Sequence, residues 1–270
     1  MLWTARTLPP KNLRRRPAGS SPSRTPPWQD FTEENIDAVF SGGESPRKKA
    51  GATPDEQVRL IAELADTWAA SAAYANELYG YAVTDLDGNG RLELIAAHYG
   101  GTGHYTYARF YEVNDACTAL VPCPYAAEEG ESQADLLFGP EAAYYSSAAG
   151  ITYYIFKDSG KLGAAEYPET TLALWLDSGE VQTLPLAAKY AAYKDNGTLD
   201  DLSVTDWTGA EIGDAEYAAS GDRYFAGQQK LSASFGWLEM PPEDVKNTDS
   251  ETLAALLLDS YRGFSVREAP

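Results

Sequence analysis

Oxygen-bearing side chains alternate along one short acidic loop of this sequence. Asp85, Asp87 and Asn89 occupy the first, third and fifth positions of the loop, and Glu93 occupies the ninth. Ca²⁺ takes about six to eight oxygen ligands, and a loop of alternating acids supplies several of them from a few residues. Arg91, at the seventh position, would add its main-chain carbonyl. The predicted metal ligands are therefore Asp85, Asp87, Asn89, Arg91 and Glu93.

The glycine at the sixth loop position supports this interpretation. Gly90 permits a sharp turn, because glycine takes a positive φ without steric cost. Asp, Asn and Gly are also the usual residues of polar surface turns. The complete D-x-D-x-N-G-x-x-E spacing, with apolar runs on both sides, favours a metal loop over such a turn.

The loop departs from an EF-hand at its last ligand position. An EF-hand places a bidentate Glu at position 12 between two helices, whereas this chain has Ala96 there. The flanking runs 81–83 and 92–96 are short and apolar, which predicts strands. The loop therefore resembles the strand-associated calcium loops of FG-GAP and VCBS-type repeats. Either Glu93 is bidentate, or water and a remote carboxylate complete the shell. The expected dissociation constant is about 10⁻⁴–10⁻³ M or somewhat tighter.

Charge divides the chain into two parts. The segment 1–29 holds six basic and no acidic side chains, while the net charge of the whole chain is −19. An acidic body argues against nucleic-acid binding, which requires cations that displace counterions from phosphate. We also find no run of 18 or more apolar residues, and therefore expect no membrane span.

Composition predicts the domain organisation. Residues 1–50 are rich in Arg, Pro and Ser, which indicates a mostly disordered tail with a short helix near 32–40. Residues 51–270 are expected to form a single domain. The segment 1–29 lacks the apolar core of a signal peptide. The protein is therefore either cytoplasmic or an exported protein whose natural start differs from this one.

One long helix is expected to lead into the acidic loop. Thr53 and Glu56 form a capping box around Pro54, and apolar residues then recur every three or four positions. With Gly80 as the stop signal, this helix would be about 26 residues long. Beyond the loop, β-prone runs are followed by helices near 214–225 and 248–263. The order predicts an α+β fold, in which a long N-terminal helix packs on a largely antiparallel sheet followed by C-terminal helices.

Several segments resemble a family of uncharacterised exported proteins and lipoproteins of Gram-positive gut bacteria. The resemblance covers roughly residues 54–240 by this pattern comparison. It is carried by segments 81–95, 101–103, 105–107, 211–217, 224–227 and 235–237. It implies export to the cell surface or medium and a cation-binding loop, but no known activity.

Signals for catalysis are few. The chain contains no nucleophile elbow, Walker loop, H-E-x-x-H or G-x-G-x-x-G motif. His98 and His104 follow the loop, and a hydrolase site there would require both imidazoles to point at the loop carboxylates. Cys117 and Cys123 are separated by five residues, and we expect a disulfide slightly ahead of two free thiols.

Tyrosines provide the remaining signal. Tyr105, Tyr107 and Tyr111 fall on one face of an expected strand, with Tyr99 nearby. Sheet packing is the favoured interpretation, and an exposed platform for a glycan or peptide is the alternative. The leading hypothesis is a non-enzymatic calcium-binding domain, secreted or of the cell envelope, with one structural Ca²⁺. The alternatives are a carbohydrate- or peptide-binding module and a hydrolase using His98 and His104.

Overall fold

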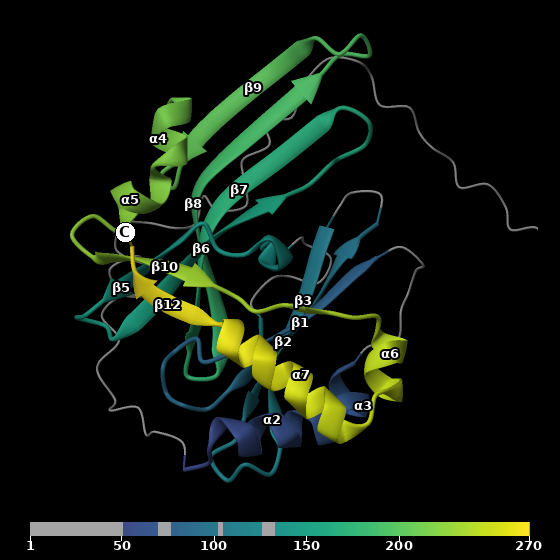
Figure 1. The fold of residues 1–270 in the computed structure, drawn as a ribbon. Helices are drawn as coiled ribbons and strands as arrows, with labels where there is room; N and C mark the ends of the chain where they lie inside the picture. Colours follow the sequence, from purple (N-terminus) through teal and green to yellow (C-terminus); the bar gives the residue numbers. More distant parts are fainter. Residues whose placement is uncertain (1–50, 70–76, 102–104, 126–132, 270) are drawn as a thin grey trace, which may run out of the picture.

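The structure is a computed structural model that describes residues 51–69, 77–101, 105–125 and 133–269. Its strands form two antiparallel sheets, and helices flank them (Figure 1). The fold is therefore mixed α+β, as the sequence predicts. The expected tail at 1–50, with its short helix near 32–40, lies outside the described residues.

Sheet A carries the acidic loop. Its five strands follow the order β11-β1-β2-β3-β4. Their bounds are β1 Leu78–Thr84, β2 Glu93–Gly100, β3 Tyr105–Val113, β4 Leu120–Cys123 and β11 Leu238–Glu239. β1 and β2 form an antiparallel hairpin whose register pairs Thr84 with Glu93. The loop is therefore the connection at the tip of this hairpin.

Sheet B is larger and lies against sheet A. Its seven strands follow the order β12-β10-β5-β6-β7-β8-β9. Their bounds are β5 Ala142–Ser146, β6 Ile151–Ser159, β7 Glu166–Asp177, β8 Glu180–Tyr193, β9 Leu199–Asp206, β10 Gln229–Ser234 and β12 Ser265–Glu268. The long strands β7, β8 and β9 project beyond the rest of the domain (Figure 1).

The helices of the described segments are short. Their bounds are α2 Pro54–Glu63, α3 Ala65–Trp68, η1 Leu136–Phe138, α4 Asp214–Ala218, α5 Ser220–Tyr224, α6 Pro242–Asn247 and α7 Ser250–Gly263. The helix predicted near 214–225 is thus two helices, and the last predicted helix corresponds to α7. Within the described residues, no helix is long and apolar enough to cross a membrane.

The long N-terminal helix predicted from the sequence is shorter than expected. The capping box is present, since Glu56 N donates to Thr53 Oγ1 and Thr53 N donates to the Glu56 carboxylate. The helix nevertheless ends at Glu63, and α3 ends at Trp68. Gly80 lies inside β1 and is not a helix stop. Leu137 and Trp237 pack where its Cβ would be, and this close approach accounts for the glycine.

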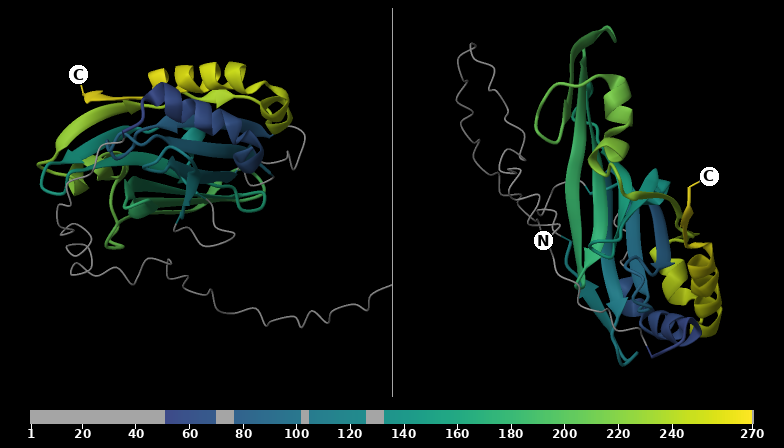
Figure 2. Two further views of the ribbon diagram at one scale, coloured as in Figure 1. Left: turned by 90° about the horizontal axis from the view of Figure 1, so that it is seen from below. Right: turned by 90° about the vertical axis from the view of Figure 1, so that its left-hand side faces the viewer.

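Four layers build the domain (Figure 2). α2 and α7 pack on the outer face of sheet A, where Val58, Ile61 and Leu257 are buried with Leu94. The inner face of sheet A packs on sheet B. α5 lies near the far face of sheet B, where Phe225 is buried. The acidic loop stands at one end of the interface between the two sheets.

Candidate metal centre

The acidic loop is shaped by hydrogen bonds from its own main chain. Gly90 N donates to Asp85 Oδ1 (3.1 Å), and Asn89 N donates to Asp87 Oδ1 (3.1 Å). Gly88 and Gly90 take φ values of +69° and +81°, a region that residues with a Cβ rarely adopt. The predicted strand–loop–strand arrangement and the turn at Gly90 are confirmed.

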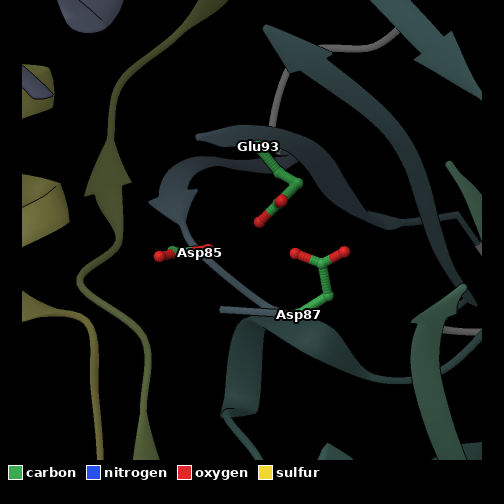
Figure 3. A group of neighbouring side chains, drawn as sticks. All are labelled: Asp85, Asp87 and Glu93. Atoms are coloured by element: carbon green, nitrogen blue, oxygen red, sulfur yellow. The ribbon is translucent and has the colours of Figure 1, made fainter. Parts of the chain in front are cut away.

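Three carboxylates of the loop converge. One side-chain oxygen from each of Asp85, Asp87 and Glu93 lies within 4.8 Å of the others. Figure 3 shows Glu93 and Asp87 directed toward one another, with Asp85 beside them. The three residues come from the end of β1, the loop itself and the first position of β2. A single cation between them can therefore contact all three.

Glu93 is the most constrained member of this acidic triad. Its side chain is fully buried. Oε2 accepts hydrogen bonds from Leu86 N (2.7 Å) and Thr84 Oγ1 (3.0 Å). Oε1 has no hydrogen-bond donor among the described residues. A buried carboxylate oxygen without a donor is costly, because it has lost its hydration without a replacement. A metal ion in the triad would supply that missing partner.

Burial and mutual repulsion dominate the electrostatics of the triad. Burial, followed by the charge of Asp87, holds the pKa of Glu93 well above its usual value. Burial also raises the pKa of Asp85, although the main-chain N–H of Gly90 opposes this shift. Both shifts indicate that three negative charges are unfavourable here unless a cation compensates them. Arg91, the basic residue of the loop, points elsewhere.

The side chains of Asn89 and Arg91 bond to neighbouring protein groups, and metal binding by Asn89 and by the Arg91 carbonyl stays a prediction. The Asn89 amide nitrogen donates to Asp87 Oδ2 (3.0 Å) and to Glu112 Oε1 (2.9 Å), and its Oδ1 accepts from Arg91 N (2.6 Å). The Arg91 guanidinium pairs with Glu112 (2.9 Å) and Asp115 (2.7 Å). The structure thus brings together Asp85, Asp87 and Glu93. Asn89 instead bridges two carboxylates as a donor.

Two residues outside the loop support it and were missed in the sequence. Glu112 of β3 lies opposite Glu93 in the strand register and anchors both Asn89 and Arg91. Gln57 of α2 is buried and bonds to the main chain on both sides of Arg91. No local pattern identified Gln57, because its partners in the loop are far along the chain from it.

The metal ligands that the triad offers are all carboxylate oxygens, and His98 faces away from them. His98 is five residues beyond Glu93 in β2 and on the opposite face of the strand. Its ring stacks between Tyr79 and Tyr107, with centroid separations of 5.5 and 5.3 Å. His98 therefore does not point at the loop carboxylates, and His104 lies outside the described residues.

The cysteines are both free thiols, so the expected disulfide is not formed. Cys123 is buried in β4, opposite Phe110 of β3. Cys117 lies in the preceding turn, with a φ of +50°. The extended strand from Leu120 carries Cys123 away from this turn, which explains why five intervening residues do not close a bridge.

The tyrosines of β3 share a face, as predicted. Tyr107 is exposed and Tyr111 is partly buried, whereas Ala108 and Phe110 are buried on the other face. The Tyr107 and His98 rings stack face to face, with planes 26° apart. A stack of this kind presents ring edges and not a broad coplanar surface. A glycan or peptide partner stays a prediction.

No protein-family model, curated protein or solved structure matches this chain. The geometry of the triad therefore carries the functional argument.

Proposed function

We propose that the loop between β1 and β2 binds one Ca²⁺ ion and that this ion stabilises the domain without taking part in a reaction. The observation that carries the proposal is the fully buried Glu93, whose carboxylate faces Asp87 (Figure 3) and whose Oε1 has no donor among the described residues. Asp85 and Asp87 supply the other two carboxylates. Main-chain carbonyls and water would complete the shell.

The donor set favours calcium among the biological cations. Zn²⁺ prefers Cys and His ligands, and the triad consists of carboxylates alone. Mg²⁺ requires near-octahedral geometry and keeps several waters, whereas Ca²⁺ accepts irregular shells of about six to eight oxygens. Three carboxylates from one short hairpin connection suit the irregular oxygen shell of Ca²⁺ better.

The ion would act as a cross-link within the fold. The triad spans the end of β1 and the start of β2, and Tyr154 of β6 donates to Leu86 O within the loop (2.9 Å). Neutralising the triad would therefore fix the hairpin tip and its contact with sheet B. Extracellular modules bind calcium with dissociation constants of about 10⁻⁴–10⁻³ M. A site of that affinity suits a protein of the cell envelope or the medium, which is the location we propose.

The test is thermal unfolding in calcium and in chelator. With about 10 mM Ca²⁺, roughly 10–100 times the proposed dissociation constant, the ion should add about 1.4–2.7 kcal/mol of stability. Asp87→Asn should abolish most of this gain, while Asp195→Asn, in an exposed turn, should retain it. A melting temperature of the native chain that does not respond to calcium would refute the proposal. Mg²⁺ at the same concentration serves as the ion control.

A further inference from the structure

Helix α2 reaches the metal loop through a single buried side chain. Gln57 is fully buried. Its amide nitrogen donates to Gly90 O (2.8 Å), and its Oε1 accepts from Leu92 N (2.8 Å). The amide nitrogen also donates to Ala52 O (3.2 Å), just before the helix begins. Donor and acceptor of one amide are therefore both used to join α2 to the loop.

These hydrogen bonds fix the part of the loop that directly precedes Glu93. Gly90 and Leu92 flank Arg91, so Gln57 sets the path of the chain between the turn and β2. Glu93 follows directly and begins β2. We call the two hydrogen bonds from Gln57 to Gly90 and Leu92 the Gln57 clamp. Without this clamp, the Glu93 carboxylate can shift relative to Asp85 and Asp87. Because metal affinity depends on ligands held in place by their neighbours, this clamp affects binding without touching the ion.

We propose that Gln57 is a positioning residue of the calcium site and that calcium binding strengthens the docking of the first turn of α2. This inference rests on the proposed function, since it concerns the same ion. The coupling is reciprocal. If the Gln57 hydrogen bonds raise the affinity of the loop for calcium, bound calcium strengthens those hydrogen bonds by the same factor. The segment that enters α2 at residues 51–57 is thereby coupled to the hairpin tip of sheet A.

Hydrogen exchange of the native chain tests the coupling directly. Amides at the start of α2, including Gln57 N bonded to Thr53 O, should exchange several-fold more slowly with about 10 mM Ca²⁺ than with chelator. Amides of β12, remote from the loop, serve as the internal control. Calcium protection of the loop without any change in α2 would overturn the coupling.

Substitution tests the positioning role. Gln57→Met preserves the length of the side chain and removes all three bonds, and it should weaken calcium binding about tenfold, the equivalent of one hydrogen bond. The matched control is Ile61→Val, also fully buried in α2. It weakens the packing of α2 but removes no hydrogen bond to the loop, and its calcium affinity should equal that of the native chain.

The outcomes separate this inference from the function on which it rests. If the native chain binds calcium and Gln57→Met binds it equally well, Gln57 is structural only and the inference fails while the proposed function stands. If both variants lose affinity alike, the effect is one of general stability and the inference also fails. A native chain that binds no calcium refutes the proposed function itself. Should Gln57→Met not fold, the exchange experiment on the native chain decides.

Discussion

Glu93→Gln should stabilise the metal-free protein and remove its response to calcium. The substitution keeps an oxygen that can accept from Leu86 N and Thr84 Oγ1. It removes one of three charges that lie within 4.8 Å of one another. The new amide nitrogen, in the position of Oε1, can donate to the carboxylate of Asp87.

The magnitude follows from the geometry of the triad. At an effective dielectric constant of about 20, two like charges 4.8 Å apart repel by about 3.5 kcal/mol, and the substitution removes two of the three pairs. Because the pKa of Glu93 is raised, protonation already relieves part of this repulsion in the metal-free protein. We therefore expect Glu93→Gln to be more stable than the native chain in chelator by about 1–3 kcal/mol, including the new hydrogen bond.

Calcium should offset most or all of this difference. The native chain gains about 1.4–2.7 kcal/mol in about 10 mM Ca²⁺, equivalent to a few degrees of melting temperature per kcal/mol for a domain of this size. The variant should gain almost nothing. Urea unfolding followed by tryptophan fluorescence, with Asp195→Asn as the control, measures both conditions. A variant that is less stable than the native chain by the same amount in calcium and in chelator would refute the reasoning.

Three further outcomes are expected. Tyr154→Phe removes the buried bond to Leu86 O and should lower the free energy of unfolding by about 1–2 kcal/mol; a loss below about 0.3 kcal/mol in urea unfolding would contradict this. Cys117 should react with a maleimide before Cys123, because burial raises the pKa of the Cys123 thiol to about 12; equal labelling rates in the native state would be inconsistent with the structure. Burial raises the pKa of Tyr153 from 10.0 to about 12. Its contribution to the free energy of unfolding is complete below pH 10.0 and is lost as pH rises to about 12, by up to about 3 kcal/mol. The difference in phenolate absorbance between the native chain and Tyr153→Phe, from which the signal of the exposed tyrosines cancels, should report this ionisation together with unfolding. A difference that appears near pH 10 in folded protein would count against the burial.

Local chemistry explains what could be predicted from the sequence. The spacing of Asp85, Asp87 and Glu93 around Gly90 placed the loop between two strands, because a turn and its ligands are encoded within nine residues. The start of α2 was predictable for the same reason, since Thr53 and Glu56 carry its cap. These features depend on neighbours in the chain and are visible without the fold.

The predictions from the sequence fail where contacts between distant parts of the chain determine the structure. Gly80 appeared to be a helix stop, but the packing of Leu137 and Trp237 is what requires a glycine there. The predicted helix does not reach Gly80, because Leu78–Thr84 is a strand that pairs with β2. The role of Gln57 follows from a contact with a distant part of the chain, and the orientation of the Asn89 amide from a partner in β3. Neither contact has a local sequence signature.

The central claim is that the Asp85–Asp87–Glu93 triad binds one calcium ion. The most direct measurement is a calorimetric titration of Ca²⁺ into chelator-treated protein, with Asp87→Asn titrated in parallel. We expect one ion per chain, with a dissociation constant near or below about 10⁻³ M, and loss of this binding in the variant. Absence of saturable binding to the native chain, or equal binding to Asp87→Asn, would contradict it.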